Sequence, residues 1–241
     1  MTYRLKATAL FWATGLASAG TTGAIAIDTG AAPPPDAATP INLIAQGAEG
    51  GAVELEDQLS GVALRDALQQ GGYVIYFRHA QTEQDYADQA DPNIDLNDCS
   101  TQRALSEYGW RQARVIGEAF EDLAIPVGKV YASQYCRAWQ TAAIAFGNYE
   151  KSPALNFYPA EEYTDEQFAQ MRAAVMPFLT AVPPRGLNTV IVGHDDVFEA
   201  ATGIYPEPQG VAYVVQPDGN GGFELIANLT PLDWALIPDA D

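Results

Sequence analysis

The sequence has 241 residues, of which 48% are hydrophobic, so it can bury a sizeable core. It carries 31 acidic and 12 basic residues, which gives a formal net charge of −19 at pH 7 and a pI near 4.2. This balance argues against a broad surface for nucleic acid or anionic lipid, because such surfaces need clustered lysine and arginine. Any anion that the protein binds must therefore sit in a local pocket.

The N-terminus has the three parts of a signal peptide. Arg4 and Lys6 form a basic start, an apolar run follows, and the small residues "ASA" at the end of residues 1–19 fit a cleavage site. An apolar run of about 13 residues is short for a membrane span, so cleavage is favoured over an uncleaved anchor. We therefore expect an exported protein. The Ala-rich and Lys-poor composition favours a bacterial periplasm.

Residues 20–54 are typical of a flexible linker. They contain "APPPDAATP" and "GAEGG" and show no hydrophobic period. No second break of this kind follows, so we expect one folded domain over residues 55–241.

Helices and strands alternate through this domain. In chain order we expect a helix over 59–70, a strand over 73–77, a helix after Ser106, a strand over 129–132, a helix over 137–146, a helix after Thr164, a strand over 189–192, a helix over 196–201, and strands over 212–216 and 223–227. The last two strands flank the turn-rich "PDGNGG" and form a hairpin. The pattern predicts a three-layer α/β/α domain with a mainly parallel central sheet and an antiparallel C-terminal edge.

Two of the helices begin with capping signals. Ser106 is a good N-cap, with Leu105 and Trp110 at the positions of a hydrophobic staple, and Thr164 with Gln167 forms a capping-box pattern. Apolar residues then recur at helical spacing after Ser106 and should face the core: Trp110, Ala113, Ile116, Phe120 and Leu123.

The two histidines of the chain each follow a predicted strand. His79 comes after the first strand, next to Arg78, and His194 comes after the strand over 189–192. Ligands of open α/β sheets bind beyond the carboxyl ends of the strands, so both histidines are expected to face one crevice. A third strand ends at Ser133, and the following helix opens with Arg137 at its anion-attracting N-terminus. The alternative for Ser133 is that it only caps the following helix.

Such a group of side chains suits phosphoryl transfer. Guanidinium groups match the charge that spreads over the phosphoryl oxygens in the transition state. A neutral imidazole can attack phosphorus when its other nitrogen is held by a carbonyl group, and nearby arginines favour the neutral form. The ordinary alternative for each histidine is a hydrogen-bonded core residue.

Four segments, "FRHAQT", "LSEYGWRQARVIGEAF", "SQYCRAWQTA" and "VIVGHDD", resemble the ordered motifs of the histidine phosphatase superfamily, which includes the phosphoglycerate mutases. The resemblance covers residues 61–203. It implies that His79 is the nucleophile, that Arg78 and Arg137 bind phosphate, and that His194 donates to a phosphoryl oxygen. It implies no cofactor and no metal. Gln81 replaces the glutamate usual after the first histidine.

The resemblance leaves the proton donor for the leaving group open. In mutase-like members it is a glutamate about twenty residues beyond the threonine of the third motif, which is Thr141 here. Glu161 and Glu162 stand at that distance. In the acid-phosphatase branch it is an aspartate directly after the second histidine, here Asp195. Asp195 is also explained as an N-cap of the following helix. The motif layout favours the glutamate pair.

The segment between the first two motifs is acidic, with aspartates at 85, 88, 91, 95 and 98. Its middle opens like a calcium-binding loop, but Leu96 and Gln102 stand where that loop needs glycine and glutamate, so we expect a solvated acidic loop. Arg103 is a candidate phosphate-binding residue or a plain surface arginine. Cys99 and Cys136 are expected to form a disulfide if the protein is exported, and two buried thiols are the alternative.

These observations predict an exported phosphomonoesterase that acts on a small phosphorylated substrate through phosphohistidine. The alternatives are a phosphoglycerate mutase, a non-catalytic phosphate-binding module, and a metal hydrolase. Export argues against the mutase, whose substrates are cytoplasmic. Two histidines with no third correctly spaced ligand give the metal hydrolase little support.

Overall fold

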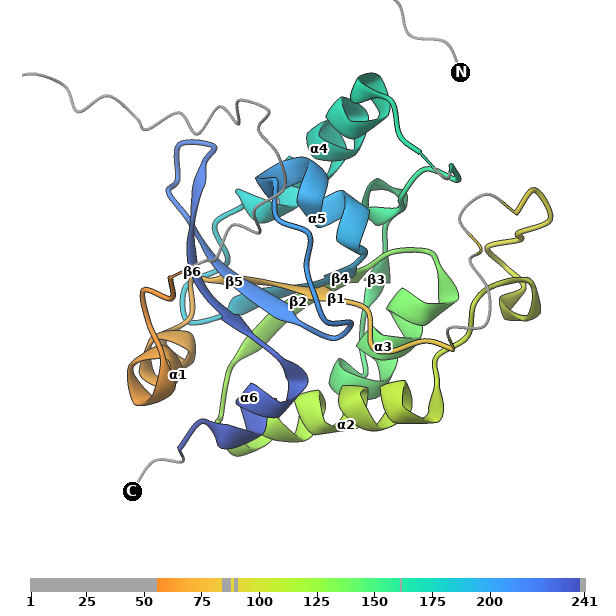
Figure 1. The fold of residues 1–241 in the computed structure, drawn as a ribbon. Coiled ribbons are helices and arrows are strands. Elements are labelled where there is room, and N and C mark those ends of the chain that lie inside the picture. The colour runs from red at the N-terminus through yellow and green to blue at the C-terminus, as the bar shows by residue number, and fades with distance from the viewer. Residues whose placement is uncertain (1–55, 84–87, 89–90, 161, 239–241) are drawn as a thin grey trace, which may run out of the picture. The chain divides into compact units, whose positions relative to one another are not determined.

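The computed structural model describes residues 56–83, 88, 91–160 and 162–238 (Figure 1). The signal peptide and the linker expected over residues 1–54 lie outside this part of the chain. Their boundaries stay predictions.

Within the described residues the strands form one sheet. They are β1 (Val74–Arg78), β2 (Val127–Ala132), β3 (Glu150–Lys151), β4 (Asn188–Gly193), β5 (Ala212–Pro217) and β6 (Phe223–Leu229), in the order β3-β2-β4-β1-β5-β6. The first four strands of this order are parallel, β5 is antiparallel to β1, and β6 is antiparallel to β5. The mainly parallel sheet with an antiparallel C-terminal edge is therefore confirmed.

Helices cover both faces of the sheet (Figure 1). They are α1 (Gly61–Gln70), α2 (Glu107–Asp122), α3 (Cys136–Phe146), α4 (Asp165–Leu179), α5 (Asp195–Thr202) and α6 (Pro231–Leu236), with short 3-10 turns at Cys99–Thr101 and Pro153–Leu155. Helices α4 and α5 lie on one face, and α1, α2, α3 and α6 lie on the other (Figure 1). The sequence analysis did not predict β3 or α6, which are two and six residues long.

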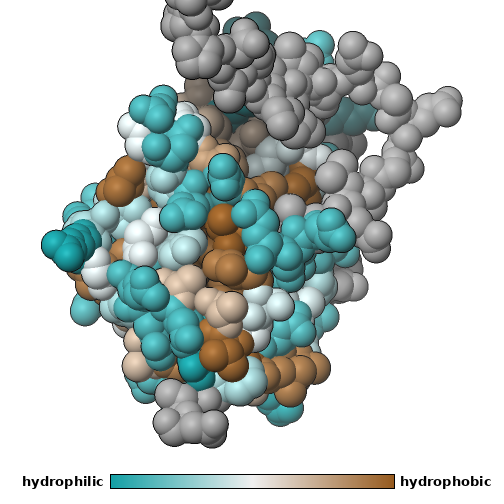
Figure 2. Space-filling model, turned by 90° about the vertical axis from the view of Figure 1, so that its left-hand side faces the viewer, coloured by the Kyte–Doolittle hydropathy of each residue, from teal (hydrophilic) through white to brown (hydrophobic). Residues whose placement is uncertain are grey.

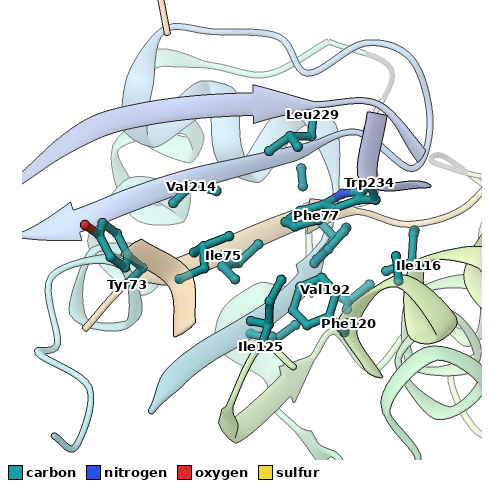
Figure 3. Close-up of a cluster of buried hydrophobic side chains, with 14 of the residues drawn as sticks. Tyr73, Ile75, Phe77, Ile116, Phe120, Ile125, Val192, Val214, Leu229 and Trp234 are labelled. Atoms are coloured by element: carbon teal, nitrogen blue, oxygen red, sulfur yellow. The ribbon is translucent and has the colours of Figure 1, made fainter. Parts of the chain in front are cut away.

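The side chains of β1 alternate between two cores. Ile75 and Phe77 face the layer of α1, α2, α3 and α6, where the Phe77 ring lies 6.0 Å from that of Phe120 and 5.9 Å from that of Trp234 (Figure 3). Tyr76 faces α4 and α5 and packs 4.8 Å from Phe198. Full burial of each large apolar side chain contributes roughly 1.5–3 kcal/mol, so β1 is anchored from both faces. This fixes the position of the residue that follows the strand.

Both predicted capping signals are present. The Ser106 side chain accepts a hydrogen bond from the Gly109 amide, and Thr164 and Gln167 form a capping box. The prediction that Trp110 faces the core is wrong, because its side chain is 41% exposed. The first turn of α2 packs through Gly109, whose Cα lies so close to the Gln81 carbonyl that a Cβ would be 1.9 Å from its oxygen. Trp110 is one position further around the helix and faces outward.

Exposed large hydrophobic side chains are scattered over the described surface, and on the face seen in Figure 2 small apolar groups alternate with hydrophilic ones. Among the helices of the described residues, none is long and apolar enough to cross a bilayer.

Candidate active site

The two histidines meet at the carboxyl ends of neighbouring parallel strands. His79 directly follows β1, and its amide donates to the Gly193 carbonyl at the end of β4. His194 directly follows β4 and occupies the N-cap position of α5. Both side chains are buried, and their ring centroids are 5.4 Å apart. The structure thus brings the two histidines together at the carboxyl ends of β1 and β4.

The hydrogen bonds of His79 fix its tautomer. Its Nδ1 lies 2.9 Å from the Ala80 carbonyl oxygen, and the Nε of Arg137 lies 3.2 Å from its Nε2. A carbonyl oxygen can only accept and a guanidinium can only donate, so the proton is on Nδ1 and the lone pair is on Nε2. Burial, and then the charge of Arg137, lowers the pKa of His79 well below its ordinary value. The imidazole is therefore neutral at pH 7.

His194 is held through both its backbone and its ring. The hydroxyl of Tyr76 donates to the His194 carbonyl at 2.8 Å and accepts from its amide at 2.9 Å. The ring Nε2 lies 2.8 Å from the Ser133 hydroxyl, which also lies 2.8 Å from Asn156 Oδ1. Burial, then the charge of Arg137, lowers the pKa of His194 as well. Its buried Nδ1 has no partner among the described residues and is the nitrogen left for a ligand.

Arg78 ends β1 and lies in a cluster of acceptors. Its guanidinium contacts Asp195 at 2.6 Å, the Pro206 carbonyl at 2.8 Å and Glu207 at 3.2 Å, and it lies over the ring of Tyr205. Its side chain is buried. The ion pair places Asp195 beside the expected phosphate site. Asp195 is the first residue of α5, so its alternative interpretation as the N-cap is wrong.

Arg137, in the first turn of α3, contacts both His79 and a buried carboxylate. Its Nη1 lies 2.9 Å from Asp88 Oδ2, and the same oxygen accepts from the Arg103 amide at 2.7 Å. Asp88 is 0% exposed, so the prediction of a solvated aspartate is wrong at this position. The buried carboxylate is stabilised there because a guanidinium and a backbone amide both donate to it.

The candidate proton donors differ in their surroundings. Glu161 lies outside the described residues, and Glu162 is exposed. Asp195 accepts from the Tyr205 hydroxyl at 2.7 Å in addition to its ion pair with Arg78. Its neighbour Asp196 accepts from Tyr163, and burial followed by the charge of Asp195 raises the pKa of Asp196 to about 6.

The predicted disulfide joins the acidic segment to α3. Cys99 and Cys136 are bonded, with their Cα atoms 5.7 Å apart. The Cys136 amide also donates to the Gln102 side chain at 2.8 Å. The segment that carries the Arg103 amide is thus fixed to the start of the helix that carries Arg137.

Several contacts of the site were missing from the sequence analysis. The sequence marked Asp88 only as one aspartate of an acidic segment, and Tyr76 only as a buried strand residue. No sequence pattern indicated a role for Asn156. Among the described residues, no group of three or more His, Cys, Asp or Glu side chains is arranged to hold a metal ion.

Two cavities are lined by residues close to His79 in the chain, but neither histidine lines them. One, of about 490 Å³, is lined by residues that include Gln81, Tyr108 and Arg111. The other, of about 470 Å³, is lined by residues that include Arg78, Tyr108 and Glu207. Arg111 is paired with Glu107 on the same helix.

The chain is similar to several proteins of known structure. The protein histidine phosphatase SixA, solved with tungstate, is 16% identical over 67% of this chain and 98% of its own, with a TM-score of 0.48. TTHB049 from Thermus thermophilus is 20% identical over 66% and 99%, with a TM-score of 0.45, and Rv3214 from Mycobacterium tuberculosis is 16% identical over 66% and 98%, with a TM-score of 0.49. At these values the likeness carries no conclusion about activity. No curated protein sequence matches the chain significantly.

The sequence model of the histidine phosphatase superfamily (branch 1) matches residues 74–156. The matched region contains Arg78, His79, Arg103 and Arg137, and it ends before His194. It thus includes the imidazole of His79 and the guanidinium groups of Arg78 and Arg137, which lie near the end of β1. Over these residues, about a third of its length, the chain is similar to the histidine phosphatase superfamily.

Proposed function

We propose that the protein is an exported phosphomonoesterase that hydrolyses a small phosphate ester through a phosphohistidine at His79. The observation that carries the proposal is the neutral imidazole of His79, with its proton held by the Ala80 carbonyl and its Nε2 lone pair directed at Arg137. A nucleophile and a phosphate-binding cation are thereby in contact. The match of residues 74–156 to the histidine phosphatase model supports phosphatase or phosphotransferase chemistry in general.

In the first step His79 Nε2 attacks phosphorus, and the bond from phosphorus to the ester oxygen breaks. Arg78 and Arg137 bind the phosphoryl oxygens, whose charge grows in the transition state. In this structure the Ser133 hydroxyl donates to Asn156 Oδ1 and therefore accepts from His194 Nε2. His194 donates from Nδ1 to a phosphoryl oxygen once that hydroxyl turns to donate to Nε2, because the ring proton is then on Nδ1. The leaving alkoxide takes a proton from a carboxyl group.

We assign that proton to the adjacent pair Asp195 and Asp196. Asp195 contacts the phosphate-binding Arg78, and position is the first requirement of a general acid. Burial, then the charge of Asp195, raises the pKa of Asp196 to about 6, so Asp196 holds a proton in mildly acidic solution. Glu162 is exposed and has the weaker position.

In the second step water attacks the phosphohistidine. The bond from phosphorus to Nε2 breaks, and inorganic phosphate leaves. The carboxylate left by the first step accepts the proton of the attacking water. The net reaction is ester plus water to alcohol plus phosphate, and His79 returns to its neutral form.

Hydrolysis is favoured over mutase activity by the charges of the two cavities. A phosphoglycerate carries a carboxylate that needs its own cation. The arginines that line the cavities are Arg78, which is paired with Asp195 and Glu207, and Arg111, which is paired with Glu107. Export is supported by the N-terminal sequence and by the disulfide, since disulfides persist in oxidising compartments.

The test is hydrolysis of p-nitrophenyl phosphate by the purified protein and by His79→Ala. We expect the substitution to lower kcat by at least about 10³-fold, because it removes the nucleophile. The wild type should form an acid-labile, base-stable phosphoenzyme and should be inhibited by vanadate.

Full turnover by a folded His79→Ala protein would refute the nucleophile. Binding of phosphate without turnover by the wild type would instead favour the non-catalytic module. Transfer of the phosphoryl group to an added phosphoglycerate, with no release of phosphate, would favour the mutase.

A further inference from the structure

The buried carboxylate of Asp88 lies where the site is expected to bind an anion. Its Oδ2 accepts from two donors, the guanidinium of Arg137 at 2.9 Å and the amide of Arg103 at 2.7 Å. Its Oδ1 has no partner within the part of the chain that the structure describes. Asp88 and Arg137 are almost completely buried, with side-chain exposures of 0% and 2%.

The same guanidinium is shared with the proposed nucleophile. Arg137 contacts His79 Nε2 through its Nε and Asp88 through its Nη1. A phosphoryl group attacked by His79 must put an oxygen against Arg137, because that cation is in contact with the attacking nitrogen. The donors that now hold Asp88 Oδ2 are a guanidinium and an amide, which is the pair of donors that a phosphoryl oxygen prefers.

We propose that Asp88 is an internal competitor of the phosphoryl group, and that the Arg103 amide and Arg137 Nη1 together bind one phosphoryl oxygen once Asp88 has left. The proposal rests on the proposed function of this site. In this proposal Arg103 binds the phosphoryl group through its backbone amide. The disulfide and the contact of Gln102 with the Cys136 amide hold that amide against α3.

The competing explanation is that Asp88 orients Arg137. The two explanations predict effects of opposite sign. If Asp88 competes with phosphate, the apparent affinity for phosphate is the intrinsic affinity multiplied by the fraction of molecules in which Asp88 has left, and removing its charge raises that fraction. If Asp88 only orients Arg137, removing its charge loosens the guanidinium and weakens the binding of phosphate.

The experiment measures binding of inorganic phosphate by calorimetry to the wild type, Asp88→Asn and Asp91→Asn. The Asp88→Asn substitution keeps the size of the side chain and an oxygen for the Arg103 amide, but removes the charge. Asp91 is exposed in the same acidic segment, so its substitution controls for the loss of one negative charge. We expect Asp88→Asn to lower the Kd for phosphate about tenfold and Asp91→Asn to change it less than about threefold.

An unchanged or higher Kd in Asp88→Asn overturns the proposal. A second measurement on the wild type covers the case in which the variant does not fold. Carbodiimide labels exposed carboxylates, and mass spectrometry locates the label. Tungstate, an unreactive analogue of phosphate, should raise labelling of Asp88 and leave Asp91 unchanged. Inhibition by tungstate while Asp88 stays unlabelled contradicts the proposal.

The outcome is separable from that of the proposed function. Tighter phosphate binding in Asp88→Asn without any hydrolysis of p-nitrophenyl phosphate supports the competitor and refutes the phosphatase. Hydrolysis through His79 with no gain in phosphate affinity in Asp88→Asn supports the phosphatase and refutes the competitor.

Discussion

At the scale of single residues, the site is a set of neutral imidazoles among paired charges. His79 and His194 are buried, and burial lowers the pKa of both, so neither carries a positive charge at pH 7. The positive charge comes from Arg78 and Arg137, and each is paired with an aspartate. A phosphate dianion therefore enters a site in which both cations already have carboxylate partners.

The choice of proton donor is tested with two leaving groups. An alkyl phosphate needs a proton on its leaving oxygen, whereas p-nitrophenolate leaves without one. We expect Asp195→Asn to lower kcat for the alkyl ester about 10²-fold and to change kcat for p-nitrophenyl phosphate only slightly. The wild-type rate on the alkyl ester should fall as the pH rises above about 6, because Asp196 then loses its proton.

Glu162→Gln is the control, and it should behave like the wild type on both esters. If Glu162→Gln or Glu161→Gln loses rate selectively on the alkyl ester, while Asp195→Asn does not, the glutamate pair is the donor.

At the scale of elements, the site depends on close contacts between backbones and on one covalent link. The first turn of α2 lies against Gln81, just after the proposed nucleophile His79, because Gly109 has no Cβ. Gly193 similarly leaves room for the Tyr76 hydroxyl, which a Cβ would approach to 2.2 Å, and that hydroxyl bonds to the backbone of His194. The disulfide then joins α3 to the segment that carries the Arg103 amide.

Replacing both cysteines by serine should lower stability and phosphate affinity together. The disulfide spans 37 residues, for which the chain-entropy treatment gives a stabilisation of about 4 kcal/mol. We expect the Cys99→Ser, Cys136→Ser protein to lose this amount in denaturant unfolding. Its Kd for inorganic phosphate should rise, since the Arg103 amide is no longer held against α3.

Alkylation of the untreated wild type, followed by mass spectrometry, is the companion measurement and should find no free thiol. Two alkylated cysteines, or equal unfolding free energies for the two proteins, contradict this role of the disulfide.

At the scale of the whole molecule, the net charge of −19 opposes the approach of an anionic substrate. The Debye length shortens from about 30 Å at 0.01 M to about 8 Å at 0.15 M salt, so added salt screens this repulsion. We expect kcat/KM for p-nitrophenyl phosphate to rise about threefold over that range while kcat stays constant. A fall in kcat/KM with added salt would show that the field of the local arginines dominates over the net charge.

The sequence alone determined the alternation of strands and helices, the parallel sheet with its antiparallel edge, and the proximity of His79 and His194. These features follow from local patterns: apolar runs of strand length, capping residues such as Ser106, and polar residues directly after strands. The same patterns missed β3 and α6, which are too short to show a period, and placed Trp110 in the core because periodicity does not show where a neighbouring backbone covers a helix.

The tertiary structure alone decided how the charges are paired. Asp88 is one of several similar aspartates in its segment, and only the fold brings its carboxylate to Arg137, which lies 49 residues away in the sequence. Likewise, the pairing of Arg78 with Asp195 and the contact of Ser133 with His194 join segments that are distant in the chain. Such contacts depend on which strand ends are neighbours and on how deeply each side chain is buried, and neither quantity has a local signal in the sequence.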